Sequence, residues 1–179
     1  MPEVVVRRAV PADASGIGRV RVEAWREAYT GRMPQSILDG MDVEQATEFW
    51  RSVIAGDPPY DEGETWVAEV DGAIGGFASS GPSADEGAVA GRPHLYALYV
   101  LAEHYGSGAG QMLLDAAIGT AAATLWILED NPRARAFYVR NGFRPDGIVK
   151  DDDQWGDPVR EVRMVRPEQP ELSGSGSPD

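Results

Sequence analysis

The sequence predicts an α/β protein of the mixed α+β kind, in which helices cover a mixed sheet in one domain. Short β-rich segments alternate with segments of helical periodicity between residues 4 and 166. A strand, a glycine-rich loop, a helix and another strand follow one another between His94 and Glu129. The chain of 179 residues is long enough for one full core and short for two.

The first half of the chain is expected to form three strands and two helical regions. These elements are a strand over 4–10, a helix over 14–29, a helical region over 35–54 interrupted near Gly40, and two strands over 65–70 and 74–79. Pro11 ends the first strand, and Asp71-Gly72 readily takes the positive φ angles of a tight hairpin turn. Residues 80–93 are rich in Gly, Ser, Ala and Pro and are predicted to be a loop.

The second half is expected to alternate strands and helices before two closing strands. These elements are a strand over 94–101, a helix over 108–118, a strand over 125–129, a helix over 131–141 and strands over 143–149 and 159–166. Asn131 is a suitable N-cap, Pro132 suits the first helical position, and Gly142 suits a left-handed C-terminal cap. The segment between Leu114 and Leu125 is short, so the preceding helix is expected to end near Gly119.

The composition changes near the C-terminus, where Pro, Glu, Ser and Gly dominate from Pro167 onward. We therefore predict a domain over residues 1–167, followed by a flexible C-terminal tail over 168–179. A loop containing Asp151, Asp152, Asp153 and Gly156 is expected between the two closing strands.

Composition and charge argue against several classes of partner. The formal net charge of −13 disfavours nucleic acid and anionic membranes and mildly favours a cationic or amine-bearing partner. The alternative, which we favour, is that the acidity simply keeps the protein soluble. The sequence lacks an apolar run of the roughly 18 residues that span a bilayer and a secretory signal, so a cytoplasmic protein without a membrane partner is expected. The absence of cysteine excludes disulfides, thiolate metal sites and a cysteine nucleophile, and no metal is expected.

A glycine-rich loop precedes the helix over 108–118. Its residues are Tyr105, Gly106, Ser107, Gly108, Ala109, Gly110 and Gln111. A loop without side chains at a helix start presents unpaired backbone N–H groups to an anion, and the helix dipole adds to the attraction. Glycines also serve tight turns, which is the alternative interpretation. The loop lacks the Lys-Ser/Thr of a P-loop and the third glycine of a dinucleotide fingerprint.

Two motifs resemble the GNAT superfamily of N-acetyltransferases. The family pattern Gln/Arg, two residues, Gly, one residue, Gly/Ala is similar to Tyr105, Gly108 and Gly110, with a departure at the first position. A second pattern of the family is matched in order, by Asn131, Ala134, Tyr138, Gly142 and Phe143. The resemblance covers roughly residues 4–166. It implies the GNAT acyl-CoA N-acyltransferase fold, with the order strand, two helices, three strands, helix, strand, helix and two strands.

The resemblance also implies that acetyl-CoA is the co-substrate and which residues bind it. In this family the pantetheine arm pairs with the strand here represented by Leu98, Tyr99 and Val100, and a backbone N–H near Leu98 faces the thioester oxygen. The glycine loop from Tyr105 to Gln111 would hold the pyrophosphate. Asn131 would contact the cofactor in addition to capping its helix, and Arg133 and Arg135 would meet the 3′-phosphate unless they are only solvated helix charges.

Catalytic residues are implied in the same way. Tyr138 would be the general acid that protonates the departing thiolate, with a half-buried core tyrosine as the alternative. His94 lies at a strand position where family members carry the general base, with a strand-end histidine of no catalytic role as the alternative. The acceptor would lie near Trp25 and Tyr29. Further candidates around that pocket are Glu23, Glu27, Asp152, Asp153 and Trp155, of which several are expected to be surface charges.

The function implied by the resemblance is N-acetylation of a primary amine, of a small molecule or a peptide, by direct attack in a ternary complex. A non-catalytic acetyl-CoA binding or sensing domain and a purely structural interaction domain are the alternatives. The identity of the amine does not follow from the sequence, and a homodimer is left open.

Overall fold

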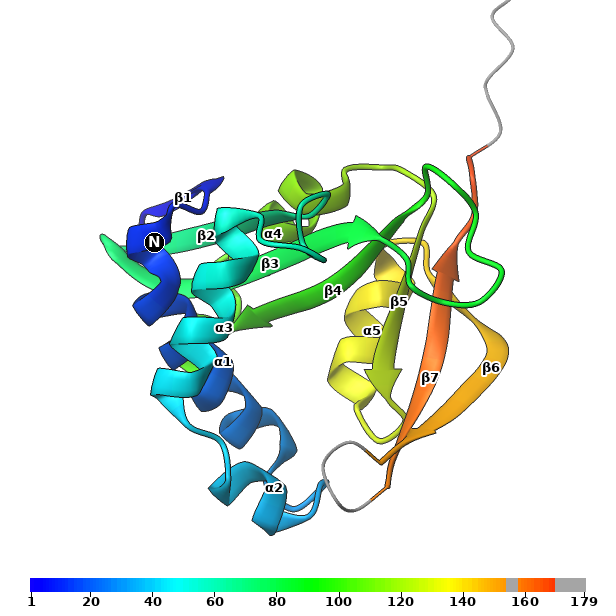
Figure 1. Ribbon diagram of the computed structural model, residues 1–179, viewed down its shortest axis with the longest axis horizontal. Coiled ribbons are helices and arrows are strands. Elements are labelled where there is room, and N and C mark those ends of the chain that lie inside the picture. The colour runs from blue at the N-terminus through cyan, green and yellow to red at the C-terminus, as the bar shows by residue number, and fades with distance from the viewer. Residues whose placement is uncertain (154–157, 170–179) are drawn as a thin grey trace, which may run out of the picture.

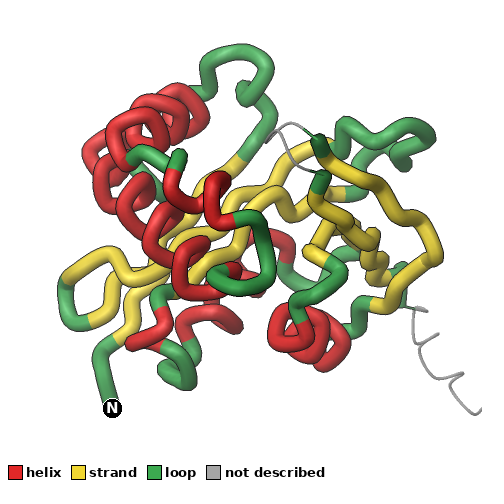
Figure 2. The backbone as a smooth tube through the Cα atoms, turned by 90° about the horizontal axis from the view of Figure 1, so that it is seen from below, coloured by secondary structure: helices red, strands yellow, loops and turns green. Residues whose placement is uncertain are grey.

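The computed structural model describes residues 1–153 and 158–169, which form a seven-stranded mixed sheet with helices on both faces (Figures 1 and 2). The strands are β1 Val4–Arg8, β2 Glu64–Val70, β3 Ala73–Pro82, β4 Pro93–Val100, β5 Ala123–Leu128, β6 Arg144–Asp152 and β7 Val159–Arg166. The helices are α1 Ala14–Tyr29, α2 Gln35–Asp39, α3 Val43–Ala55, α4 Ala109–Ile118 and α5 Pro132–Arg140. The mixed α/β class and the order of elements predicted from the sequence are confirmed.

The sheet consists of two antiparallel parts joined by one parallel pair. Its strand order is β1-β2-β3-β4-β5-β7-β6. Strands β1 to β4 pair antiparallel with their neighbours, as do β5, β7 and β6, whereas β4 and β5 run parallel. Strands β4 and β5, where the two antiparallel parts meet, are therefore the parallel pair of this sheet.

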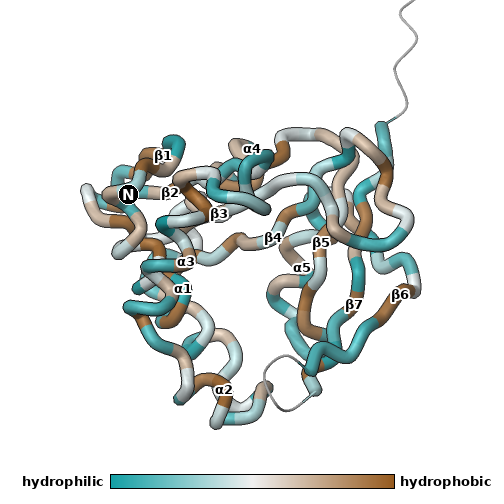
Figure 3. The backbone as a smooth tube through the Cα atoms, in the orientation of Figure 1, coloured by the Kyte–Doolittle hydropathy of each residue, from teal (hydrophilic) through white to brown (hydrophobic). Residues whose placement is uncertain are grey.

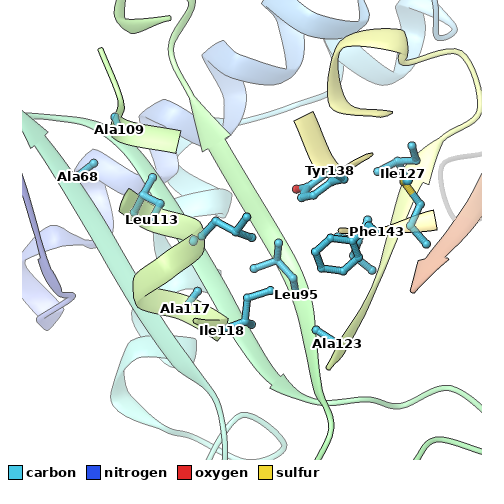
Figure 4. Close-up of a cluster of buried hydrophobic side chains, with 14 of the residues drawn as sticks. Ala68, Leu95, Ala109, Leu113, Ala117, Ile118, Ala123, Ile127, Tyr138 and Phe143 are labelled. Carbon is cyan, nitrogen blue, oxygen red and sulfur yellow. The ribbon is translucent and has the colours of Figure 1, made fainter. Parts of the chain in front are cut away.

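Two apolar layers fill the space between the sheet and its helices. On one face, α1 and α3 pack on β2, β3 and β4 through a cluster that includes Ile17, Val20, Trp50 and Phe77. On the other face, α4 and α5 cover a cluster that includes Leu113 and Phe143 (Figure 4). The colouring of Figure 3 alternates between apolar and polar along α1 and β7, as expected for elements with one buried side.

Local sequence signals explain the helix ends that matter for the site. Asn131 caps α5 because its side-chain oxygen accepts a hydrogen bond from the N–H of Ala134 at 3.1 Å, and Gly142 follows with a φ of 88°. The hairpin between β2 and β3 turns at Asp71 and Gly72, both with positive φ. Helix α4 ends at Ile118, as the short following segment predicts.

Several predicted boundaries differ from the structure: β1 ends at Arg8 instead of Val10, and β5 begins at Ala123 instead of Leu125. The larger differences lie at the ends of β3 and β6. Residues 80–82 belong to β3 rather than to a loop, because Ser80, Gly81 and Pro82 lie opposite Leu95, His94 and Pro93 in β4. Cross-strand pairing thus outweighs their weak intrinsic strand propensity. Asp151 and Asp152 extend β6 through pairing with β7, rather than starting the loop. Trp155 and Gly156, and the part of the predicted tail over 170–179, lie outside the described residues.

Candidate active site

The sheet opens between β4 and β5. These parallel strands are paired only at His94 with Thr124 and at Leu95 with Leu125. A β-bulge bends β4 just beyond this point, since Ser79 faces Ala97 whereas Ser80 faces Leu95, which leaves Tyr96 as the extra residue. The hydroxyl of Tyr96 donates to the carbonyl of Pro82 and accepts from the N–H of Ala84, and these bonds hold the bulge. Beyond the bulge, the side of β4 that faces β5 has no strand partner among the described residues.

A cleft of about 920 Å³ occupies this opening. It is lined by α1, the end of β4, the glycine loop, β5, α5 and parts of β6 and β7. The predicted site residues that line it are Trp25, Tyr29, His94, Leu98, Tyr99, Val100, Tyr105, Gly106, Gly108, Gly110, Gln111, Asn131 and Tyr138. The structure therefore brings together residues from distant parts of the chain.

The glycine loop presents unpaired main-chain amides to the cleft. Gly106 and Gly108 have φ angles of 81° and 90°, which residues with a side chain rarely adopt, and a Cβ at either position would meet nothing within 4 Å. Among the described residues, the N–H groups of Gly106, Gly108, Gly110 and Gln111 make no hydrogen bond. All four of these residues line the cleft at the start of α4, so the arrangement suits a diphosphate.

Two residues of the glycine loop, Ser107 and Ala109, make contacts within the protein and do not face the cleft. The Ser107 hydroxyl accepts a hydrogen bond from the N–H of Ala109 at 3.3 Å, and Ala109 is buried in the core beneath α4. Neither residue is among those that line the cleft.

An arginine lies beside the first position of the glycine motif. The guanidinium of Arg133 lies over the ring of Tyr105, with its central carbon 2.9 Å from the ring centroid, and both residues line the cleft. Arg133 thus adds positive charge beside the unpaired amides, although the motif itself has a tyrosine in place of Gln or Arg. Arg135, the other predicted phosphate ligand, does not line the cleft.

Three phenols meet inside the cleft. Tyr138 is only 7% exposed, and burial, followed by the nearby Tyr99, raises its pKa. Burial likewise raises the pKa of Tyr29 and of Tyr99. The described residues provide no hydrogen-bond partner for the Tyr138 hydroxyl, which is turned toward the side on which β4 lies (Figure 4). These phenols stay protonated at neutral pH, and the Tyr138 hydroxyl is free to donate a proton.

His94 lies where β4 and β5 are still paired. Its Nδ1 is 2.8 Å from the hydroxyl oxygen of Thr124, and its ring lies 4.5 Å from that of Tyr96. Burial lowers the pKa of this histidine to about 4, so the imidazole is neutral at neutral pH. A neutral imidazole can accept a hydrogen bond or a proton, but a pKa this low makes His94 a weak base at neutral pH.

The acidic candidates for the acceptor pocket divide into two groups. Glu23 pairs with Arg19 at 3.0 Å, Glu27 accepts a hydrogen bond from the N–H of Ala102 at 2.8 Å, and Asp153 is exposed, so none of these lines the cleft. Asp152 does line it. Trp25 and Tyr29 pack edge to face with ring centroids 5.1 Å apart, and Asn131 donates to the Tyr29 hydroxyl at 3.5 Å.

The sequence analysis missed five charged residues that line the cleft, namely Arg21, Asp85, Arg140, Lys150 and Glu161. Burial raises the pKa of Glu161, while Lys150, 3.2 Å away, opposes that shift. Arg21 lies four residues after Ile17 and four before Trp25, on the apolar side of α1. An arginine at this spacing, on the apolar side of an amphipathic helix, is the sequence feature that could have indicated its role.

Two general findings concern the described part of the chain. It contains no helix with the length and apolar character that crossing a bilayer requires. Within the same residues, no group of three or more His, Asp or Glu side chains is placed to bind a metal ion.

Comparisons with known proteins support the resemblance that the two motifs carry. The family described as acetyltransferase (GNAT) domain matches residues 61–145. The uncharacterized N-acetyltransferase YuaI of Bacillus subtilis is 29% identical over 157 residues, covering 83% of this chain and 84% of that protein. A probable N-acetyltransferase of Mycobacterium tuberculosis is 29% identical over 150 residues, covering 79% of this chain and 80% of that protein.

The fold agrees with these relatives. The crystal structure of PaiA N-acetyltransferase from Thermoplasma acidophilum, in complex with coenzyme A, superposes with a TM-score of 0.68 at 19% identity, covering 92% of this chain and 98% of that one. A ribosomal-protein-alanine N-acetyltransferase from Brucella melitensis gives 0.66 at 22% identity, covering 90% of this chain and 98% of that one. The matching family model, the two relatives and the shared fold together support a GNAT N-acetyltransferase.

Proposed function

We propose that this protein transfers the acetyl group of acetyl-CoA to a primary amine of a small molecule or peptide, by direct attack in a ternary complex. The observation that carries the proposal is the row of unpaired amides at Gly106, Gly108, Gly110 and Gln111, at the edge of the cleft between β4 and β5. The neighbour from Thermoplasma acidophilum was solved with coenzyme A, which supports the choice of co-substrate.

Different groups of residues in the cleft can be matched to successive parts of acetyl-CoA, from its phosphates to its thioester. The loop amides and Arg133 would bind the phosphates, and the open edge of β4 at Leu98, Tyr99 and Val100 would bind the pantetheine amides as an added strand. Asn131 would lie beside the arm from the start of α5. When bound, acetyl-CoA supplies a thioester whose carbonyl carbon the amine attacks.

Proton transfers are assigned to two titratable groups that line the cleft, His94 and Tyr138. His94, or water in contact with it, would take the proton that the ammonium must lose before attack. As the new C–N bond forms and the C–S bond breaks, Tyr138 would give its hydroxyl proton to the departing sulfur. A main-chain N–H near Leu98 would stabilise the developing negative charge on the carbonyl oxygen. Trp25 and Tyr29 would border the amine.

Thiol release from acetyl-CoA in the presence of a broad amine panel tests the proposal. We expect release above background hydrolysis with at least one amine, together with the acetylated product in mass spectra. Tight binding of coenzyme A without turnover on any amine would contradict the enzyme and indicate a binding domain. No binding of coenzyme A at all would contradict both functions.

A further inference from the structure

Arg21 is a half-buried cation, and the described residues give its guanidinium no anionic partner. It extends from the middle of α1, and its guanidinium carbon lies 3.7 Å from the ring centroid of Trp25 and 5.2 Å from that of Tyr99. The Nη1 atom is buried and has no hydrogen-bond partner among the described residues. Within those residues, no carboxylate oxygen lies within 4 Å of the Arg21 guanidinium.

This state is costly for the protein. An arginine stays protonated at any ordinary pH, so Arg21 cannot escape burial by losing its charge. Burying an ion without a partner destabilises the folded state, and stacking on aromatic rings offsets only part of that cost. Burial lowers the pKa of Arg21, because removing the guanidinium from water disfavours its charged form. Arg19, two residues earlier on α1, instead pairs with Glu23 and donates to the carbonyl of Ile74.

The missing anion is not the phosphate part of the co-substrate. Arg21 lies on α1, which packs on the sheet face that carries Ala97 and Tyr99. The glycine loop leads into α4, which packs on the opposite face (Figures 1 and 2). Arg21 nevertheless lines the same cleft. It borders the part formed by α1, where Trp25 and Tyr29 are proposed to contact the acceptor.

The cleft also has an acidic wall. Glu161 and Asp152 line it from β7 and β6, beside Lys150, and Tyr99 of β4 lines the same cleft. Glu161 pairs with Lys150 rather than with Arg21. A cationic wall and an acidic wall in one cleft match a ligand that carries both signs of charge.

We propose that Arg21 binds a carboxylate of the acceptor, so that the acceptor is an amine that also carries a carboxylate, as amino acids do. The proposal rests on the proposed function for the amine end of this ligand. The planar guanidinium offers paired N–H donors whose spacing fits a carboxylate, and the Trp25 ring holds that plane in place.

Equilibrium binding tests the carboxylate subsite without turnover. The probes are N-acetylglycine, N-acetyl-β-alanine and N-acetyl-γ-aminobutyrate, each paired with its neutral primary amide and titrated into the full chain in the presence of coenzyme A. These probes vary the spacing between acetamide and carboxylate. We expect at least one carboxylate to bind about tenfold or more tightly than its amide, as charge-assisted pairing implies.

Three variants assign this preference to the guanidinium. Arg21→Met should abolish it, Arg21→Lys should retain only part, and Arg19→Met, on the same helix but outside the cleft, should keep it whole. Arg21→Met should also raise the thermal midpoint, because it removes a half-buried charge without an anionic partner among the described residues. If Arg21→Met loses coenzyme A binding, the Arg21→Lys variant supplies the comparison.

The outcomes separate the subsite from the acetyl transfer. No carboxylate preference at any spacing, or a preference that persists in Arg21→Met, overturns the proposal. In turnover assays, equal kcat/KM for an amino acid and its decarboxylated amine would also overturn it while leaving the acetyltransferase intact. A carboxylate preference that depends on Arg21, without acetylation of any amine, would support the subsite and contradict the proposed function.

Discussion

Tyr138 is the residue whose chemistry can be removed most cleanly. Its hydroxyl has no partner among the described residues, so Tyr138→Phe deletes the proton donor and leaves the packing of the ring against Phe137 and Phe143. We expect kcat to fall by roughly 100-fold or more, the usual contribution of a general acid, while affinity for coenzyme A changes little. Steady-state kinetics and calorimetric titration measure the two quantities.

Tyr60→Phe is the matched control, since Tyr60 packs beside the α1–α3 layer and does not line the cleft. It should leave kcat unchanged. Equal losses of kcat and of coenzyme A affinity in Tyr138→Phe would show that the phenol is structural.

His94 predicts a dependence of stability on pH. Its pKa is about 4 in the folded protein and 6.5 in the reference state, so folding favours the neutral imidazole. The stability that this contributes is fully present above pH 6.5 and is lost as the pH falls toward 4. The loss amounts to roughly 3 kcal/mol. Urea unfolding at pH 7.5 and 4.5 should show that His94→Gln loses about 2–3 kcal/mol less than the wild type. Identical losses would mean that His94 titrates normally in the folded state.

At the scale of elements, the start of α4 supplies the unpaired amides that are proposed to bind the co-substrate. Gly108→Glu places a carboxylate among the unpaired amides and should weaken coenzyme A binding by about tenfold or more, because like charges repel and the amide cradle is filled. Isothermal titration measures the affinity.

Gly87→Glu is the matched control. Gly87 has a similar φ of 74°, has the same open space around a Cβ, and lies in the loop before β4, outside the cleft. Both variants bear the strain of a positive φ, about 1–2 kcal/mol, but only Gly108→Glu should lose affinity. Equal affinities would remove the loop from the site.

Local signals in the sequence predicted most elements. Asn131, Pro132 and Gly142 fix the ends of α5 through capping that involves only their own neighbours, and Asp71-Gly72 fixes a hairpin in the same way. Ser80, Gly81 and Pro82 were predicted as loop because their strand character comes from pairing with β4, whose partner residues lie 11 to 15 positions later in the chain. Pairing of that kind cannot be deduced from a local pattern.

The candidate site was predictable where it follows motifs. The glycine loop and Tyr138 were found because their residues occur at family spacing, and the structure places both in one cleft. Glu23 and Glu27 were included because helical spacing alone does not show which polar residues face a pocket. Arg21 and Glu161 were missed because each functions through a cleft that only the assembled sheet creates.

At the scale of the whole molecule, Arg166 joins three parts of the fold. From the last residue of β7 it donates to the carbonyls of Gly119 at 2.7 Å, Ala121 at 2.8 Å and Asn141 at 3.4 Å. It thereby ties the short segment after α4 and the end of α5 to the sheet. Arg166→Leu should lower the free energy of unfolding by about 3 kcal/mol, since three part-buried carbonyls lose a charged donor.

Arg160→Leu, on the same strand, is the matched control. Arg160 is half exposed and pairs with Glu129 and Asp151, so its loss should cost less than about 1 kcal/mol. Chemical denaturation compares the two variants. Similar small losses would show that Arg166 is not the link between these parts.

The central claim is that the amides of the glycine loop hold the co-substrate in the cleft. Nuclear magnetic resonance of the ¹⁵N-labelled protein, titrated with coenzyme A, tests it most directly. We expect the amide protons of Gly106, Gly108, Gly110 and Gln111 to move downfield and to gain protection from exchange, because each acquires a hydrogen-bond acceptor. Saturable binding that shifts other resonances and leaves these four unchanged would contradict the account.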